Sequence, residues 1–314
     1  MLKVPYLFFR DMTKTCIFKN LYASLLPKQT KQICQFSTAT SRRYSKKNAD
    51  TKLIETSVRY NGVRIQMPPN KEWSNEQFES ELLRLSEGWR ERGARSAFLE
   101  IPIQMSHVIP VASKYGFQYH HARGQQAVLC KWLVENEENK IPNFSNHTVG
   151  VAGACYREDS NELLVVRDKG KFSHWWKFPG GYSDLGEYIG ETATREVFEE
   201  TGVRSEFKSI LSFRQHHGVF YDQSDLYYIC RLNPLTYELS PCPHEIEDCA
   251  WKNINELLNV DNTTPFVKMI CRLMQHGQEV GFNEVDISEH DLENWARPGN
   301  RMKIFHRDIE SHHD

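Results

Sequence analysis

Carboxylate side chains are concentrated in one short stretch of the chain, where Glu196, Glu199 and Glu200 lie within five residues. An α-helix has about 3.6 residues per turn, so side chains at i, i+3 and i+4 share one face. Like charges at this spacing repel each other and destabilise the helix unless a cation is bound there. Mg²⁺ prefers oxygen ligands and often shares its coordination shell with substrate phosphates. The spacing therefore predicts a divalent-metal site on one face of a helix.

The residues around these glutamates suit a helix that is presented to a ligand. Gly202 fits the left-handed conformation that often ends a helix. Upstream, Gly181 belongs to a glycine-rich turn whose backbone can approach a ligand closely, and Glu187 follows that turn. The alternative interpretation of the glutamates is a solvated acidic face that is balanced by Arg195, since acidic helix faces are common.

The complete spacing is far more demanding than a pair of glutamates. Gly181 is followed by five residues and Glu187, and then by seven residues and the run REVFEETGV. This pattern, G-x5-E-x7-R-E-U-x-E-E-x-G-U with U aliphatic, resembles the signature of the Nudix hydrolases. The resemblance implies Mg²⁺- or Mn²⁺-dependent hydrolysis of the diphosphate bond in a nucleoside diphosphate linked to another group.

The resemblance also implies a role for each charged residue of the signature. Glu196, Glu199 and Glu200 would be the metal ligands. Glu187 would assist the metal shell, and Arg195 would orient a glutamate through a salt bridge. These roles agree with the chemistry, because a metal ion neutralises phosphate charge and raises the acidity of the water that it binds.

The general base is open between three glutamates. One carboxylate must accept the proton of the attacking water, and Glu199 or Glu200 could do so. Glu245 stands six residues before Trp251, in the place where many Nudix relatives carry such a residue. The alternative interpretation of Glu245 is an exposed loop acid.

The substrate is indicated less strongly than the reaction. The chain lacks the zinc cysteines of nicotinamide pyrophosphatases and the pattern of the coenzyme A subgroup. The segments HTVGVAGACY, WKFPGGYSDLGE and DNTTP resemble the Nudix subfamily of the antisense fibroblast growth factor protein and related plant enzymes. This resemblance covers roughly residues 55–282 and implies ADP-ribose or NADH as the substrate.

Three residues are candidate substrate contacts. Gly181 would bring backbone to the ligand, Trp176 would stack on adenine, and Arg214 would bind phosphate. The two side chains also have plainer interpretations, as a partly buried tryptophan and a surface strand residue. Val219 stands where ADP-ribose enzymes often have proline, which argues against strict specificity for ADP-ribose.

Two other functions remain open beside hydrolysis of a small-molecule nucleotide. One is a regulatory protein that binds nucleotides with little turnover, and the other is decapping of RNA. The intact set of mutually repelling carboxylates favours the enzyme. Residues 1–48 carry ten of the 39 basic residues and one of the 41 acidic ones, so the rest of the chain has a net charge of −11. This acidic body disfavours long nucleic acids as partners.

The strand and helix patterns predict an α+β protein with two folding units. Residues 55–138 alternate strands with a helix whose expected N-cap is Ser74, and they resemble a small acetyltransferase-like domain. The closest match to an acetyl-coenzyme A loop ends in Arg95, so we expect a homodimer contact or a substrate lid rather than acetyl transfer. Residues 147–282 would form the Nudix α/β/α sandwich with a mixed sheet. The tail, residues 283–314, has no assigned role.

The N-terminus has the composition of a targeting segment. Residues 1–44 are basic and rich in serine and threonine, and Ile17, Leu21 and Leu25 share one helical face. This is typical of a presequence for the mitochondrial matrix. The alternative is a basic tail on a cytoplasmic or nuclear protein. No apolar run approaches the ~18–20 residues of a membrane-spanning helix, so we expect no membrane partner.

Overall fold

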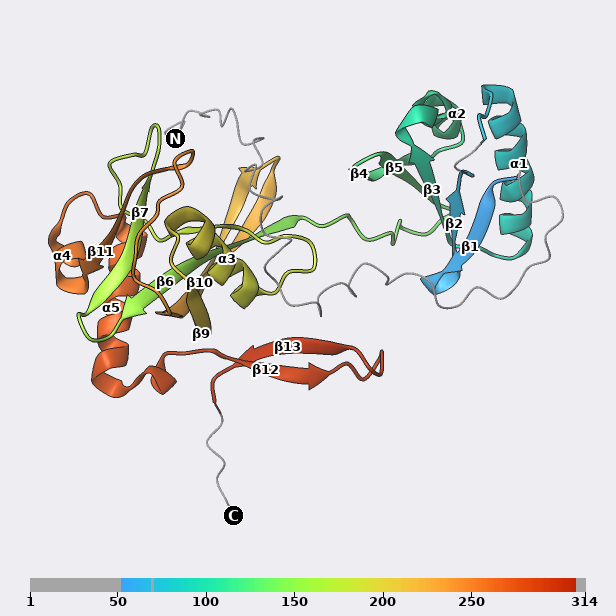
Figure 1. The fold of residues 1–314 in the computed structure, drawn as a ribbon. Coiled ribbons are helices and arrows are strands. Elements are labelled where there is room, and N and C mark those ends of the chain that lie inside the picture. The colour runs from blue at the N-terminus through green and yellow to red at the C-terminus, as the bar shows by residue number, and fades with distance from the viewer. Residues whose placement is uncertain (1–51, 69–70, 309–314) are drawn as a thin grey trace, which may run out of the picture. The chain divides into compact units, whose positions relative to one another are not determined.

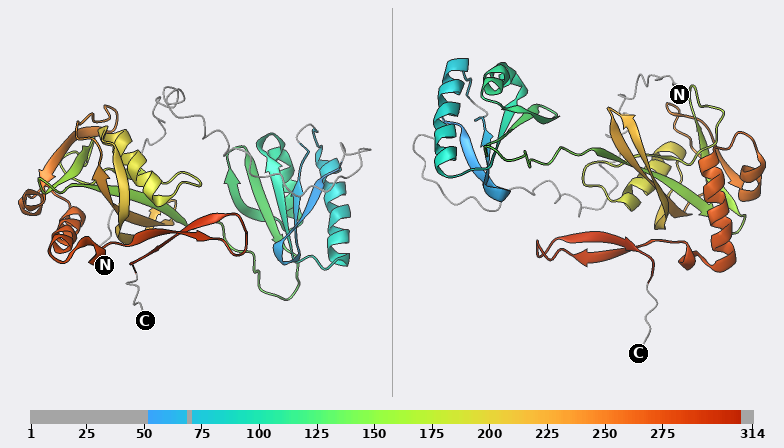
Figure 2. Two further views of the ribbon diagram at one scale, coloured as in Figure 1. Left: turned by 60° about the horizontal axis from the view of Figure 1, so that its bottom comes forward. Right: turned by 180° about the vertical axis from the view of Figure 1, so that it is seen from behind.

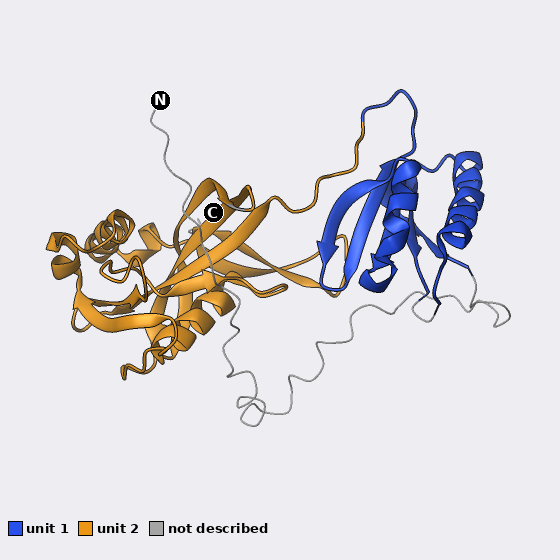
Figure 3. Ribbon diagram, turned by 90° about the horizontal axis from the view of Figure 1, so that it is seen from above, with its two compact units in different colours: residues 1–138 blue, residues 139–314 orange. Residues whose placement is uncertain are grey.

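The computed structural model describes residues 52–68 and 71–308, and the chain divides into two compact units, residues 1–138 and 139–314 (Figure 3). The expected presequence, residues 1–44, lies outside the described residues, so the mitochondrial address stays a prediction. Within the described part of the chain, no helix combines the length and the apolar character needed to cross a membrane.

The first unit is a five-stranded sheet with helices (Figure 1). Its strands, in spatial order, are β1 (Ile54–Val58), β2 (Gly62–Gln66), β3 (Ser96–Pro102), β5 (Gln126–Trp132) and β4 (Gln118–Arg123). The β2–β3 pair is parallel and the other pairs are antiparallel. The helices are α1 (Asn75–Glu91), the 3₁₀ segment η4 (Ile103–Val108) and α2 (Ile109–Lys114).

Local sequence signals account for both α-helices of this unit. Ser74 is the N-cap of α1, as predicted: its hydroxyl accepts from the Gln77 N–H at 3.3 Å, and its own N–H donates to the Gln77 side chain at 3.2 Å. Pro110 lies in the first turn of α2, where its missing N–H leaves no helical hydrogen bond unmade.

The second unit contains a six-stranded mixed sheet. Its main strands, in spatial order, are β11 (Ile246–Asn253), β7 (Glu162–Asp168), β6 (His147–Arg157), β10 (Gln223–Pro234) and β9 (Ser205–Phe220). The short strand β8 (Gly180–Tyr182) pairs with β6. Only β6 and β10 are parallel, so the predicted mixed sheet is confirmed.

Helices cover both faces of this sheet (Figure 2). On one face, α3 (Ile189–Thr201) packs Ala193 and Val197 into a core with β6 and β10. On the other face, α4 (Ile254–Asn259) and α5 (Pro265–Val280) pack against a second core. The predicted α/β/α sandwich is therefore confirmed, and α3 is the helix that carries the glutamates.

The tail that had no assigned role contains regular structure. After the 3₁₀ turn η5 (Phe282–Glu284), β12 (Ser288–Glu293) and β13 (Arg301–His306) form an antiparallel hairpin. Its root is fixed by the buried carboxylate of Asp286, which pairs with Arg231 of β10 and accepts from the Ser209 hydroxyl at 2.6 Å. No periodic pattern in residues 283–314 is long enough to predict this hairpin.

Gly153 determines how closely α3 approaches the sheet, and its substitution tests this packing. A Cβ atom at Gly153 would lie 2.5 Å from the Val197 side chain and 2.6 Å from Leu232. We expect Gly153→Ala to destabilise the second unit by about 1–3 kcal/mol through overpacking, measured by calorimetry. Gly88→Ala is the matched control, because only the Arg92 side chain lies nearby and a helical alanine should stabilise α1 by about 0.5–1 kcal/mol. An unchanged melting curve for Gly153→Ala would contradict the assigned packing.

Candidate active site

Helix α3 is held by an apolar stripe and by specific caps at both ends. Ile189, Ala193 and Val197 pack on the α3 side of the sheet, as their spacing predicts. At the N-terminus, the Tyr188 N–H donates to the Glu191 carboxylate at 3.0 Å. At the C-terminus, Gly202 has φ = 76° and donates its N–H to the Phe198 carbonyl at 2.9 Å. The helix therefore presents its glutamates from a fixed position.

The glycine turn before α3 makes room for two of these glutamates. A Cβ atom at Gly181 would lie 2.6–2.7 Å from the Glu196 carboxylate, so only glycine lets this carboxylate lie against β8. The neighbouring Gly180 donates its backbone N–H to Glu200 at 3.3 Å. Gly181 was predicted to let the backbone approach a substrate. In this structure, the group that lies close to Gly181 is the carboxylate of Glu196.

Arg195 binds three carboxylates of the signature at once. Its Nε and Nη2 donate to Glu187 at 2.7 and 2.9 Å, and its Nη1 donates to Glu196 at 2.7 Å and to Glu199 at 3.1 Å. Nη2 also donates to the Tyr182 carbonyl at 3.1 Å. The planar guanidinium suits such bidentate contact with carboxylates. Arg195 thus orients more than one glutamate.

Glu187 is the best satisfied of the acidic residues. Its carboxylate accepts from the Asp184 N–H at 3.0 Å and from the Thr192 hydroxyl at 2.9 Å, in addition to Arg195. Burial alone would raise its pKa, but the hydrogen bonds from Arg195, Asp184 and Thr192 hold the pKa of Glu187 below its usual value. Glu187 therefore stays ionised and anchors the guanidinium.

The three helix glutamates differ in exposure, which the shared helical face does not predict. The Glu199 side chain is 57% exposed and that of Glu196 is 14% exposed, whereas Glu200 is 6% exposed as a residue. Burial raises the pKa of Glu196, despite its contact with Arg195. Burial also raises the pKa of Glu200 to about 8, although Lys177 acts in the opposite direction.

Lys177 and Asp168 belong to this site, and sequence reasoning missed both. Lys177 Nζ lies 2.9 Å from the Asp168 carboxylate, and the Lys177 backbone pairs with Val166 of β7. Burial would lower the pKa of Lys177, but the charges of Glu200 and Asp168 raise it overall. The only signal in the sequence was the position of Lys177 in WKFPGG, three residues before the glycine turn.

The donor set fits a hard divalent cation. Every side chain that could bind a cation here is a carboxylate, and the buried Glu200 carboxylate has one long hydrogen bond, at 3.3 Å. Among the described residues, no three acidic, histidine or cysteine side chains converge on one point as they stand. Arg195 holds Glu196 and Glu199 instead, so a cation would have to replace Arg195 as their partner.

Glu245 lies on an exposed loop, so its role as base stays a prediction. Its carbonyl accepts from the Lys169 N–H at 2.9 Å, which places the loop at the end of β7. The same loop returns to α3, because the Cys242 N–H donates to the Glu200 carbonyl at 3.0 Å. The backbone around Glu245 is thus tied to the glutamate helix, although its carboxylate is not.

Of the two side chains proposed as substrate contacts, Trp176 is buried and Arg214 is partly exposed. Trp176 is 6% exposed and belongs to the core on the α4–α5 side of the sheet, with Arg167 4.7 Å and Lys252 5.1 Å from its ring. The expectation that Trp176 stacks on adenine is wrong, because its ring is enclosed in this core. Arg214 remains a candidate: it is 40% exposed and lies 3.2 Å from the buried Asp225.

Arg214 is linked to the glutamates through one aromatic side chain. Its guanidinium lies 4.8 Å from the Tyr227 ring. Burial and then the charge of Glu200 raise the pKa of Tyr227, whereas Arg214 lowers it. Tyr227 therefore lies within electrostatic range of both groups, and the site extends from Glu200 toward Arg214.

Comparison with known proteins agrees with this geometry. The chain matches the NUDIX domain over residues 146–273 and the Nudix hydrolase domain over residues 54–133. It is 40% identical over 235 residues to nucleoside diphosphate-linked moiety X motif 6 of Homo sapiens, covering 74% of this chain and 73% of that protein. It is 34% identical over 268 residues to Nudix hydrolase 2 of Arabidopsis thaliana, covering 81% of this chain and 93% of that protein.

This chain belongs to the Nudix hydrolase family. A third relative, nucleoside diphosphate-linked moiety X motif 6 of Xenopus laevis, is 46% identical over 186 residues, which are 58% of this chain and 85% of that protein. Nudix hydrolases cleave pyrophosphate bonds in nucleoside diphosphate-linked compounds, generally with divalent cations. The resemblance inferred from the signature is confirmed at this level.

The burial of Glu200 predicts a stability change with a definite pH dependence. Burial raises the pKa of Glu200 to about 8 in the folded protein, whereas the unfolded chain has the ordinary value of 4.5. As the pH rises between these values, the unfolded chain loses the proton and the folded protein keeps it. The free energy of unfolding therefore decreases over this pH range. With a chelator present, we expect Glu200→Gln to melt a few degrees above the wild type near pH 8, since each kcal/mol moves the melting temperature by about 2–4 °C. The difference should vanish near pH 4.5. A variant that melts below the wild type at pH 8 would contradict the burial argument.

Proposed function

We propose that this Nudix hydrolase cleaves the pyrophosphate bond of ADP-ribose or NADH. Water would add to one phosphorus atom, releasing AMP together with ribose 5-phosphate or the reduced nicotinamide mononucleotide. The observation that carries the proposal is the complete signature, with Glu187, Glu196 and Glu199 gathered on Arg195 and Glu200 buried beside the glycine turn. The subfamily resemblance supports the substrate class.

Glu196, Glu199 and Glu200 would hold the divalent cation, which we propose to be Mg²⁺ or Mn²⁺. When bound, such a cation neutralises phosphate charge and makes its bound water more acidic. The raised pKa of Glu200 supports this assignment, because a buried carboxylate with one weak donor gains most from a nearby positive charge.

The protein's own residues would position the substrate and accept the proton. Arg195 and Glu187 fix the helix face through their paired hydrogen bonds. Glu199 is the most exposed helix glutamate and is held by a single contact with Arg195, so it can best reach a water molecule. Glu245 is the alternative base, supplied by the loop that joins α3 through Cys242.

Substitution of the helix glutamates tests the reaction. We expect Glu199→Gln and Glu200→Gln each to lower kcat for ADP-ribose at least about a hundredfold, because each removes a ligand charge or the base. Turnover with Mg²⁺ and circular dichroism are measured on the same samples. Glu206→Gln is the matched control, since this half-exposed β9 glutamate pairs with Lys208 outside the cluster. Full turnover in both folded helix variants would refute the site.

Comparing Glu199→Gln with Glu245→Gln also identifies the base. Loss of the acidic limb of the pH profile in one variant alone assigns the proton acceptor to that residue.

The Arg214 side chain tests the substrate class. We expect Arg214→Gln to raise KM for ADP-ribose and NADH about tenfold with little change in kcat, because one charged hydrogen bond to phosphate is lost. Arg214→Lys should recover part of this loss. The same assay includes coenzyme A and capped RNA. If capped RNA were the one substrate hydrolysed, the protein would be a decapping enzyme. If ADP-ribose or NADH were bound but not hydrolysed, the protein would be a nucleotide sensor.

A further inference from the structure

The C-terminal hairpin has two faces of opposite character. In its antiparallel register, Asp291 pairs with Lys303 and Leu292 pairs with Met302. Because side chains alternate between the faces of a strand, charged residues and apolar residues segregate. One face carries Glu289, Asp291, Glu293, Arg301, Lys303 and Phe305, and the other carries Ser288, His290, Leu292, Met302, Ile304 and His306.

The charged face lies against the body of the second unit. Lys303 Nζ is 2.9 Å from a carboxylate oxygen of both Glu289 and Asp291, and it lies 5.7 Å from the centre of the Tyr188 ring. On the same face, Phe305 packs against the core on the α3 side of the sheet. The internal contacts of the hairpin therefore use its ion-paired face.

The apolar face points to solvent. Leu292 is 42% exposed, Met302 36% and Ile304 42%, and Trp295 in the turn at the tip is 88% exposed. The hairpin projects from the rest of its unit in every view (Figures 1 and 2). A contiguous apolar surface of this kind marks an interaction site, and a tryptophan is the side chain that most often dominates binding energy at such sites.

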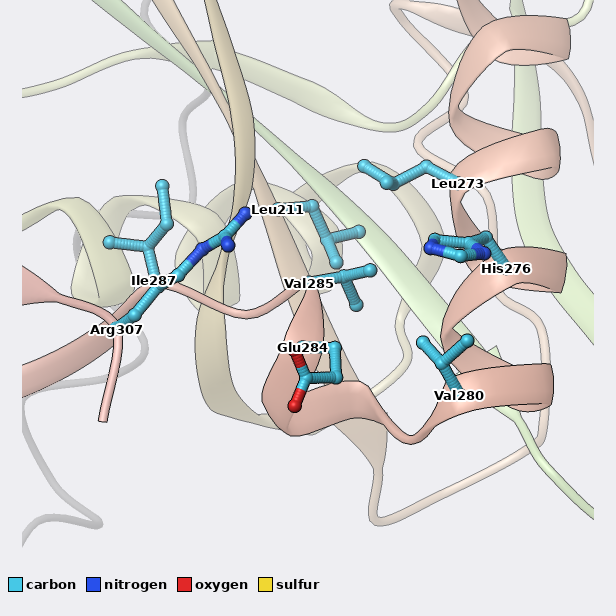
Figure 4. Close-up of a pocket in the computed structure, with 8 residues that line it drawn as sticks. All are labelled: Leu211, Leu273, His276, Val280, Glu284, Val285, Ile287 and Arg307. Atoms are coloured by element: carbon cyan, nitrogen blue, oxygen red, sulfur yellow. The ribbon is translucent and has the colours of Figure 1, made fainter. Parts of the chain in front are cut away.

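A pocket of about 590 Å³ opens at the root of the same hairpin (Figure 4). Its walls are mainly aliphatic side chains from β9, α5 and the segment before β12: Leu211, Leu273, Val280, Val285 and Ile287. Glu284 and Arg307 add one charge of each sign. The volume suits a large aromatic side chain, and the guanidinium of Arg307 can lie over an aromatic ring.

We propose that the hairpin is the interface with a second copy of this chain, in which the Trp295 tip of each copy enters the root pocket of the other. When two hairpins related by a two-fold axis lie side by side in opposite directions, the tip of each one reaches the root of the other. The interface is then formed by the same surface of both copies. The parts of the two faces that carry Leu292, Met302 and Ile304 then cover each other, and His290, which pairs with Asp308, lies at the root end of each face.

The charges at the two ends agree with this pairing. Arg297, two residues after Trp295, has no ionic partner among the residues that the structure describes, and Glu284 on the pocket wall is exposed. Antiparallel packing brings these opposite charges together at each end of the interface, which favours a second copy over an unrelated apolar partner.

Sedimentation velocity of the full chain over a range of concentrations, combined with cross-linking, tests the proposal. We expect a reversible dimer whose dissociation constant rises at least about tenfold in Trp295→Ala. Tyr221→Ala is the matched control, because Tyr221 is 98% exposed in the turn between β9 and β10 and lies outside the proposed interface. It should dimerise like the wild type.

A photoreactive phenylalanine analogue at position 295 identifies what the tip contacts. We expect a cross-linked dimer whose joined peptide includes residues 273–287. A wild type that stays monomeric at all concentrations would overturn the proposal. So would a dimer that Trp295→Ala leaves intact, or a cross-link from position 295 to residues 55–138, which would place dimerisation on the N-terminal domain.

Discussion

The contact between Arg195 and its three carboxylates is the interaction on which the arrangement of the site depends. The four glutamates of the signature, which lie within residues 187–200, would repel each other in any conformation that brings them together. One guanidinium satisfies Glu187, Glu196 and Glu199 within 3.1 Å. Arg195 does not contact Glu200. Burial raises the pKa of Glu200, and the charge of Lys177 lowers it. The cluster is therefore balanced in part, and the remaining unbalanced charge is available to a cation.

The rest of the second unit serves to bring backbone close to these carboxylates. Glycine at position 181 lets Glu196 lie against β8, and glycine at 153 lets α3 settle on the sheet. Gly202 ends the helix in a left-handed conformation, and the chain returns to bond the Glu200 carbonyl through Cys242. Small residues at these points convert a helix face, which is usually solvated, into a partly buried surface. Burial then produces the perturbed pKa values that mark functional sites.

Signals that act over a few residues were sufficient to predict much of this molecule. The signature spacing located the glutamates, and the Ser74 cap was predicted correctly. Features that depend on tertiary packing were not predictable. Asp168 ends β7 and Lys177 lies in the segment before β8, so their side chains meet only in the fold, and the burial of Trp176 depends on α4 and α5. The unequal exposure of Glu199 and Glu200 likewise follows from the contact of α3 with β8.

The hairpin of β12 and β13 connects the periphery of the second unit to the glutamate cluster. Lys303 lies over the ring of Tyr188, which precedes the first residue of α3 and follows Glu187 directly. Asp286 and Arg231 fix the hairpin root to β10, the strand that also carries Tyr227 and Asp225 of the site. A hairpin held at its root and resting on Tyr188 limits the movement of the loop that carries Glu187. A second copy of the chain that covers the outer face of the hairpin would restrict this loop further. Dimer formation and the position of the Arg195–Glu187 pair therefore both depend on the hairpin.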